Sequence, residues 1–268
     1  NGDIYRDSPW VVDGKFQRSV LSAAFTAKGL DIGKPQRTWQ RTLQSNVEHG
    51  DQKPYATDTL KLPRENPWNV PFFGTGIGFL PDGSALLATM HGDVWRITNY
   101  EYPSRQATWQ RFASGLHQPL GIVVDSDGVF VICRDQLTRL VDRNGDGEAD
   151  YYECFSNQFT TSAGGHDFIC GLERDAEGNF YTAVGGQGIL KIAADGSRSN
   201  IIATGFRNPD GLGLTVDGVL TVPCAEGTWT PASMICAVRT GHQRVGHFGF
   251  PGPRGEEVPD LPLVYLPR

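Results

Sequence analysis

The sequence predicts an all-β fold assembled from a repeated unit of short strands. The phrase Gly-(Ile/Leu)-x-x-x-x-(Asp/Glu)-Gly occurs four times, at intervals of 40 to 50 residues, and each copy runs into a β-rich segment. The 33 Gly and 17 Pro residues suit many tight turns, because glycine takes positive φ at low cost. Periods of this length with acidic-Gly turns are typical of β-propeller blades. The four copies begin at Gly76, Gly121, Gly171 and Gly211.

The repeats predict four recognisable blades, which fill the chain from near Leu60 to about Pro231. Propellers close on themselves to remove edge strands, and four blades is the low end of their range. We therefore expect these blades to be part of a larger propeller. The ending LPLVYLPR (261–268) reads as the first strand of another element.

The first 58 residues do not show the repeat, so we expect an N-terminal segment at 1–58 and the propeller blades at 59–268. Within the segment, VVDGKF (11–16) predicts a hairpin and SVLSAAFTA (19–27) an apolar strand or a short helix. The polar stretch 36–58 is expected to be a linker.

The composition excludes several classes of function. The net charge is −6 and no basic run occurs, which argues against nucleic acid as a partner, because phosphate binding needs a cationic stripe. No stretch approaches the roughly 20 apolar residues that span a bilayer. The chain starts at Asn1, which is consistent with a processed or truncated N-terminus.

Five cysteines are present, and none has CxxC or CxxCH spacing. Two interpretations remain open: buried free cysteines within strands, or one or two disulfides with at least one thiol left over. The cysteines are Cys133, Cys154, Cys170, Cys224 and Cys236.

A second repeat precedes the first and predicts the position of a site. The nine-residue segments ASGLHQPLG (113–121), AGGHDFICG (163–171) and ATGFRNPDG (203–211) align. In a propeller such segments enter the inner strand of the next blade, so their middle residues converge on the mouth of the central channel. Pockets at such mouths are the default site in this architecture. The middle residues are His117 and Gln118, His166 and Asp167, and Arg207 and Asn208.

The loops between the second and third strands of each blade are expected on the same face. Together with the entry loops they would form a dense polar cluster at the axial mouth. The alternative is that individual side chains only hydrogen-bond loop backbone. The residues of these loops are His91, Asp93, Arg134, Asp135, Gln187, Glu226 and Trp229.

The segment DRNGDGEADYYE (142–153) matches the calcium-loop pattern D-x-[DN]-x-[DN]-G-x5-E at every specified position. Hard oxygen donors at alternate positions suit Ca²⁺. The flanking LTRLV and YYECF look like strands, so a calcium-clipped β-hairpin with a structural role is expected; the alternative is an acidic turn without metal. The expected ligands are Asp142, Asn144, Asp146, the backbone carbonyl of Glu148, Asp150 and Glu153.

Several longer phrases resemble a known family. GFRNPDGLGL (205–214), HFGFPG (247–252) and a His ahead of an inner strand are similar to the glucose/sorbosone dehydrogenase propellers. A closer resemblance is to the propeller of bacterial proteins classed as membrane-bound dehydrogenases, which often carry c-type haem domains. Its recurring phrases, in order from about Asp58 onward, are LPRENPW, HGDVW, GLHQPLG, LTRLVDRNGDGEADYYECF, GGHDF and GTWTPAS.

The resemblance implies a six-bladed, secreted propeller, periplasmic or extracellular, that binds pyrroloquinoline quinone (PQQ). It implies that His166 is the catalytic base and that Arg207 and Asn208 hold the cofactor, with His117 and Gln118 nearby at the mouth. A sugar or alcohol would be the substrate, and a c-type haem domain or another protein subunit the partner. The chain departs from the family at Asp210, where an amide is usual, and in the spacing of six residues between His166 and Leu172.

Two other functions stay open on the sequence. One is a non-catalytic module that binds glycan or protein in a larger assembly. The other is a metal-dependent hydrolase or lactonase that uses Glu226, Asn208 and Asp210 around one divalent ion.

Overall fold

The computed structural model describes residues 11–12, 15–16, 37–51, 54–161, 164 and 167–267. The chain divides into two units, Asn1–Gln36 and Arg37–Arg268. In the first unit, β1 (Val11–Val12) pairs antiparallel with β2 (Lys15–Phe16), which confirms the predicted hairpin. The predicted element at 19–27 lies outside the described residues.

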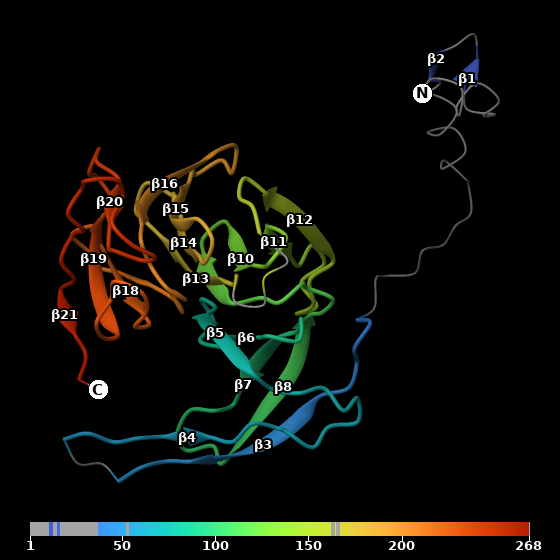
Figure 1. The fold of residues 1–268 in the computed structure, drawn as a ribbon. Helices are drawn as coiled ribbons and strands as arrows, with labels where there is room; N and C mark the ends of the chain where they lie inside the picture. The colour runs from blue at the N-terminus through green and yellow to red at the C-terminus, as the bar shows by residue number, and fades with distance from the viewer. Residues whose placement is uncertain are drawn as a thin grey trace. The chain divides into compact units, whose positions relative to one another are not determined.

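The second unit is a β-propeller arrangement of four blades, as the repeat predicted (Figure 1). Each blade contains four antiparallel strands in chain order from the inside outward. The first blade has β5 (Gly74–Phe79), β6 (Ala85–Thr89), β7 (Val94–Thr98) and β8 (Gln106–Ala113). The second has β9 (Gly121–Asp125), β10 (Gly128–Ile132), β11 (Leu137–Val141) and β12 (Tyr151–Ser156).

The third blade has β13 (Ile169–Arg174), β14 (Phe180–Val184), β15 (Gly188–Ile192) and β16 (Ser199–Thr204). Its outer edge is extended by β20 (Gly246–His247), which pairs parallel with β16. The fourth blade has β17 (Gly213–Leu214), β18 (Val219–Cys224), β19 (Met234–Arg239) and β21 (Val264–Tyr265). The described residues contain no helix, and so none that could cross a membrane.

Two segments differ from the expectations. β3 (Leu43–Glu48) lies in the expected linker, yet it pairs with β8, and β4 (Thr59–Leu60) pairs with β3 in turn. Leu43 and Val47 are buried because alternate side chains of β3 face the core of the first blade. The C-terminal segment also differs, since β21 completes the outer edge of the fourth blade by pairing with β19.

In the first three repeats, the first glycine lies where the backbone closely approaches that of the next blade. A Cβ added at Gly76 would lie 3.2 Å from the Cα of Gly121, and one at Gly121 would lie 2.8 Å from the carbonyl carbon of Gly171. One at Gly171 would lie 3.0 Å from the Cα of Gly211. The repeat therefore keeps glycine there because the backbones of successive blades meet without room for a side chain.

The hydrophobic core lies between successive blades. Phe130 of the second blade packs 4.8 Å from Phe180 of the third, ring centre to ring centre, and Phe155 lies edge-on to both. Comparable clusters join the first blade to the second and the third to the fourth. Because each blade buries its faces against its neighbours, the loops at the axial mouth rest on a rigid base.

Candidate functional site at the axial mouth

The same backbone hydrogen bond recurs in all four blades and brings the two predicted sets of loops together. A residue within two positions after the second strand donates its N–H to a residue that precedes the inner strand, over 2.8 to 3.0 Å. In each blade, the entry loop and the loop between the second and third strands are thus neighbours. The pairs are Met90 to Phe73, Arg134 to His117, Gly185 to Phe168, and Ala225 to Arg207.

Arg134 joins the second blade to the third. Its guanidinium donates to Oε1 of Gln118 at 3.1 Å and to the carbonyl of Gly164 at 3.2 Å, and it lies 5.9 Å from the ring centre of Phe168. His117, beside Gln118, is exposed. Arg134 thus orients Gln118 across the blade boundary, a contact for which the sequence carried no specific signal.

His166, the predicted base, lies outside the described residues. Its neighbour Asp167 is buried and accepts a hydrogen bond of 2.7 Å from the backbone N–H of Gly186. Gln187 accepts a 2.8 Å hydrogen bond from the N–H of Thr160. Asp167 and Gln187 thus accept hydrogen bonds from loop backbone, which was the alternative role expected for side chains of these loops.

The fourth blade presents exposed polar groups at the mouth. Arg207 is exposed and donates to the backbone carbonyl of Glu226. Asn208 has φ of 44° and Gln118, at the same position of its loop, has φ of 50°. Left-handed conformations are uncommon outside glycine and gather at ligand sites. Trp229 is also left-handed, with φ of 68°, and its side chain is 65% exposed.

The HFGFPG segment lies under these residues. A Cβ at Gly252 would lie 2.9 Å from the indole nitrogen of Trp229, and one at Gly227 would meet both the Arg207 side chain and the ring of Phe250. The segment is therefore packed closely against the mouth loops of the fourth blade, a contact that only the tertiary structure reveals.

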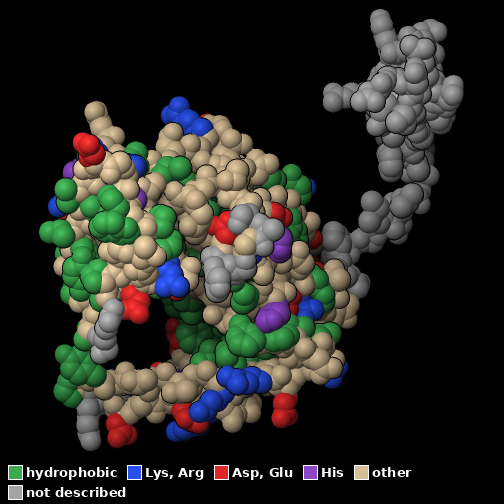
Figure 2. All heavy atoms as spheres, viewed as in Figure 1, with side chains coloured by type: hydrophobic (Ala, Val, Ile, Leu, Met, Phe, Trp, Pro, Cys, Tyr) green, Lys and Arg blue, Asp and Glu red, His purple; other side chains and the backbone are tan. Residues whose placement is uncertain are grey.

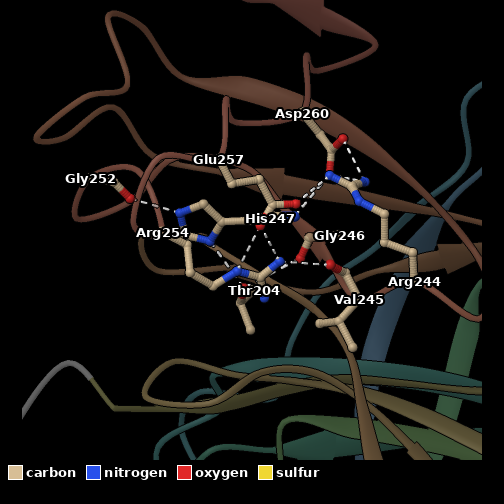
Figure 3. Close-up of polar contacts among 9 residues, drawn as sticks. All are labelled: Thr204, Arg244, Val245, Gly246, His247, Gly252, Arg254, Glu257 and Asp260. Atoms are coloured by element: carbon tan, nitrogen blue, oxygen red, sulfur yellow. Dashed lines mark hydrogen bonds and ion pairs between the residues drawn. The ribbon is translucent and has the colours of Figure 1, made fainter.

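His247 holds the HFGFPG segment in place through hydrogen bonds (Figure 3). Its Nδ1 lies 3.0 Å from Oγ1 of Thr204, and its Nε2 lies 2.7 Å from the carbonyl oxygen of Gly252. Its backbone N–H donates to Asp260, which also accepts from Arg244 at 2.9 Å. His247 belongs to the HFGFPG phrase that carries the family resemblance, but its role in holding the loop has no signature in the sequence.

Asp93 does not belong to the predicted polar cluster. Its carboxylate is buried and lies 3.2 Å from the guanidinium of Arg111, which is buried as well. The Arg111 carbon lies 4.7 Å from the ring centre of Trp68, 4.9 Å from that of Trp95 and 5.5 Å from that of Trp39. Asp93 is the counter-ion of a cation held among three indoles, a structural role.

His91, two residues earlier, is exposed and packs on Phe73 with ring centres 5.4 Å apart. Charged side chains of both signs are interspersed over the face seen in Figure 2, in keeping with the modest net charge. Asp135 and Asp210 are exposed. The mouth thus combines exposed cationic, acidic and aromatic groups.

The calcium-like loop is held by hydrogen bonds within itself. Asp142 accepts from the N–H groups of Gly145 and Gly147 at 2.7 and 2.8 Å. The side-chain amide of Asn144 donates to Asp146 at 3.1 Å and to Asp150 at 3.0 Å. These four side chains therefore converge on one turn.

Of the predicted ligands, Glu153 has another partner, whereas Glu148 was predicted to bind through its backbone carbonyl. The side chain of Glu148 accepts from the N–H groups of Thr38 and Trp39, each at 3.1 Å. Glu153 lies on β12 and pairs with Arg139 at 3.5 Å. Across the described residues, no three His, Cys, Asp or Glu side chains are grouped as a metal site requires. A cation at the turn would need the Asn144 amide to rotate so that its oxygen faces inward.

Comparisons with known proteins concern the fold. Residues 82–210 match a family model described as a domain of unknown function (DUF7133). No curated protein matches the chain. The fold is similar to a protein from Thermus thermophilus described as an oxidoreductase (glucose dehydrogenase), with 18% identity and a TM-score of 0.55. That alignment covers 73% of this chain and 70% of the other.

Two further proteins of similar fold have PQQ in their names or structures. One is the PQQ-bound aldose sugar dehydrogenase of Streptomyces coelicolor, with 14% identity, TM-score 0.50, and coverage of 69% of this chain and 64% of that one. The other is the holo PQQ domain of Coprinopsis cinerea pyranose dehydrogenase, with 13% identity, TM-score 0.56, and coverage of 86% and 64%. At these identities the likeness establishes the fold, and the chain spans about two thirds of each neighbour.

Proposed function

We propose that this chain is the propeller of a quinone-dependent sugar or alcohol dehydrogenase and that its cofactor lies at the axial mouth. The fold it shares with sugar dehydrogenase propellers supports this proposal. The observation that carries it is the exposed Arg207 beside the left-handed Asn208, on a loop packed against the HFGFPG segment. A planar guanidinium on a well-supported loop suits the carboxylates of PQQ.

In this proposal each residue has a distinct task. Arg207 and Asn208 bind the carboxylate and carbonyl oxygens of the cofactor, and His117 and Gln118 contribute from the second blade. His166 takes the proton of the substrate hydroxyl, a task that suits imidazole at neutral pH. The quinone, when bound, supplies the redox chemistry by accepting the hydride of the substrate carbon. Arg134 keeps Gln118 in place through its 3.1 Å hydrogen bond.

The test is a titration of the purified protein with PQQ, followed by absorbance. We expect saturable binding that Arg207→Ala weakens at least tenfold, the loss of one charge-assisted contact of about 1.5–3 kcal/mol. Arg198→Ala is the matched control, because Arg198 is an exposed arginine away from the mouth loops. Equal affinity in both variants, or no binding by folded protein, would refute the cofactor site.

Turnover tests the enzymatic part separately. His166→Ala is expected to abolish oxidation of sugar or alcohol by the loaded protein while thermal unfolding stays unchanged. Binding of PQQ without turnover, or binding of glycan without PQQ, would favour the non-catalytic module. Ester hydrolysis that requires a divalent ion would favour the hydrolase.

We further propose that the turn at 142–150 binds a structural Ca²⁺ through Asp142, Asn144, Asp146, the carbonyl of Glu148 and Asp150. The convergence of four oxygen-bearing side chains on one turn supports this assignment. Ca²⁺ is expected to raise the midpoint of thermal unfolding, and Asp142→Ala to remove that response. Asp135→Ala, a change of an exposed acid elsewhere, should keep it. An equal response of both variants would place the ion at another site.

We also propose that the electrons pass to a c-type haem domain or another protein subunit, in a periplasmic or extracellular setting. The resemblance to haem-carrying dehydrogenases supports this part. Reduction of a soluble c-type cytochrome by the loaded protein and substrate, followed by haem absorbance, tests it. A small-molecule quinone that accepts electrons while the cytochrome stays oxidised would refute it.

A further inference from the structure

The loop between β18 and β19 contains a tight turn with a tryptophan at its tip. The N–H of Gly227 donates to the carbonyl of Thr230 at 3.1 Å, and the N–H of Thr230 donates back to the carbonyl of Gly227 at 3.0 Å. Thr228 and Trp229 therefore form the tip of a two-residue turn, and both are exposed. Trp229 is 65% exposed, whereas the other tryptophans that the structure describes are buried or half-buried.

The conformation of this position does not favour tryptophan. With φ of 68°, Trp229 lies in the left-handed region, where glycine and asparagine are preferred because a larger side chain crowds the backbone. An indole stabilises a fold when it is buried, yet most of this one is in contact with solvent. Neither the backbone nor the core therefore explains the residue. Strained residues of this kind gather at ligand sites, which indicates that Trp229 serves a ligand.

The indole is supported along one edge. The backbone of Gly252 lies so close to it that a Cβ at Gly252 would be 2.9 Å from the indole nitrogen and 3.1 Å from Cδ1 of Trp229. The carbonyl oxygen of Gly252 in turn lies 2.7 Å from Nε2 of His247, the residue that anchors the HFGFPG segment (Figure 3). The pyrrole edge of the ring thus rests on a fixed backbone, while the rest of the ring remains open.

Polar groups of the mouth accompany the indole on the same turn. The side chains of Glu226 and Thr228 are exposed on either side of Gly227. The side chain of Arg207 packs against Gly227, since a Cβ there would be 2.6 Å from its Cδ, and its guanidinium donates to the carbonyl of Glu226. A sugar ring has a face of C–H groups that packs on an aromatic ring, and a rim of hydroxyl groups that bond to carboxylates and hydroxyls. This combination of groups therefore fits a carbohydrate.

We propose that Trp229 is the platform on which the mouth stacks a sugar ring, and that Glu226 and Thr228 bond to the hydroxyl groups of that ring. The inference rests on the proposed function, because it takes the mouth as the place where the substrate meets a cofactor held by Arg207. Among the sugars and alcohols of that proposal it selects ring sugars. A small alcohol or an open-chain polyol has no rigid C–H face to stack on an indole.

Saturation-transfer NMR on the cofactor-free protein tests the platform. The probes are methyl β-D-glucopyranoside and methyl β-D-galactopyranoside, whose rings cannot open, and sorbitol is the open-chain control. The axial protons of the glucoside alternate between the two ring faces, so stacking should saturate one alternate set more strongly than the other. Sorbitol should receive little saturation. Absence of transfer to both glycosides, equal transfer to both faces of the glucoside, or equal transfer to sorbitol would overturn the proposal.

Variants of the turn separate binding from stability. Trp229→Asn is expected to weaken glucoside binding about tenfold, because aromatic stacking contributes about that factor. Its midpoint of thermal unfolding should be equal or higher, because asparagine adopts the left-handed conformation more easily. Trp229→Phe should keep most of the binding, and Tyr55→Ala, which removes an exposed aromatic ring between β3 and β4, should keep all of it. Unchanged binding in Trp229→Asn, or a lower midpoint that makes the indole part of the fold, would contradict the proposal.

Titration with PQQ distinguishes a failure of this inference from a failure of the proposed function. The affinity for PQQ is expected to be the same in Trp229→Asn and in the natural protein, because the indole contacts the sugar and not the cofactor. Loss of PQQ affinity in this variant with glucoside binding intact would assign the indole to the cofactor and overturn the inference. Glucoside binding through Trp229 by a protein that does not bind PQQ would support the platform and refute the dehydrogenase.

Discussion

The two ends of the blades differ in how their charged side chains are used: one end carries the acidic-Gly turns and the other the mouth loops. At the turn end, one acid in every blade accepts hydrogen bonds, within its own turn or, for Asp127, from Arg174 of the next blade. At the mouth end several charged side chains are exposed. The engaged acids are Asp82, Asp127, Asp175 and Asp217. The exposed residues are His91, His117, Arg207 and Glu226. In three blades this acid is the one of the repeat, whereas Asp175 precedes the repeat acid Glu177 by two residues. The engaged acids thus serve the fold, and the exposed residues at the mouth can contact a ligand.

The pKa values of the turn acids reflect this engagement. Hydrogen bonds from Ser84 lower the pKa of Asp82, and those from Arg174 lower the pKa of Asp127. Burial opposes the shift at Asp175, yet hydrogen bonds from Asn179 and Tyr181 lower its pKa as well. In each case the ionised form is the one that the turn binds, so the charge is part of the fold.

Asp93 is expected to have the largest effect on stability. It lies among the mouth residues in the sequence, but it is paired with Arg111 as a structural acid is. Asp93→Ala leaves Arg111 buried and charged without its counter-ion. The expected loss in the free energy of unfolding is about 3–5 kcal/mol. Urea unfolding measures it, with the exposed Asp135→Ala as control, expected to stay within about 0.5 kcal/mol. Similar losses in both variants would contradict the structural role of Asp93.

Gly121→Ala tests the contact between the inner strands of neighbouring blades, on which both the turn end and the mouth end depend. The new Cβ would lie 2.7 Å from the backbone nitrogen of Leu172, and backbone has little freedom to yield. Overpacking of this kind costs about 1–3 kcal/mol. Gly241→Ala is the matched control, since a Cβ there meets nothing within 4 Å. Equal midpoints of thermal unfolding would show that the blades can separate at no cost.

The variant Asp127→Asn tests, through the pH dependence of stability, whether the charge of a turn acid stabilises the fold. The pKa of Asp127 is lowered from its ordinary value of 3.8 when folded, so its contribution is present above that value and is lost as pH falls through the folded pKa. Because the carboxylate is partly exposed, we expect roughly 1 kcal/mol or less. The variant should therefore differ from the natural protein at pH 7 and approach it as the pH falls below the folded pKa of Asp127, which lies under 3.8. A difference that persists in acid would point to a lost contact other than the charge.

His117→Ala is expected to have the smallest effect on stability, within about 0.5 kcal/mol, because the side chain is exposed at the mouth. Its effect should instead be on the affinity for PQQ. Paired measurements of urea unfolding and PQQ titration separate the two. A variant that unfolds more easily and binds normally would place His117 with the turn-end residues.

Much of the fold could be predicted because its cause is local. The glycine at each repeat start and the acidic-Gly turn are visible as a period, and both follow from backbone geometry that recurs in every blade. β3 was not predicted, because a polar strand at an outer edge shows only Leu43 and Val47 as inward positions. β21 was not predicted as part of the fourth blade, because its pairing with β19 spans a long loop.

The candidate site was predictable only in part. The alignment of the entry loops placed Gln118 and Asn208 at equivalent positions, and both take the left-handed conformation. The partner of a side chain, however, depends on which distant residue the fold brings near. The sequence therefore places Asp93 among the mouth residues, whereas the fold pairs it with Arg111. The phrase HFGFPG likewise gives no sign that His247 bonds to Thr204.

The all-β class, the four blades and the common face of their loops could be predicted from the sequence, because they depend on periodic glycine, turns and strand alternation. Tertiary structure alone decided which polar groups are used by the fold and which remain exposed. The physical reason is that burial and pairing depend on contacts between residues far apart in the chain. Arg111 among its three indoles and His247 between Thr204 and Gly252 are both products of such contacts.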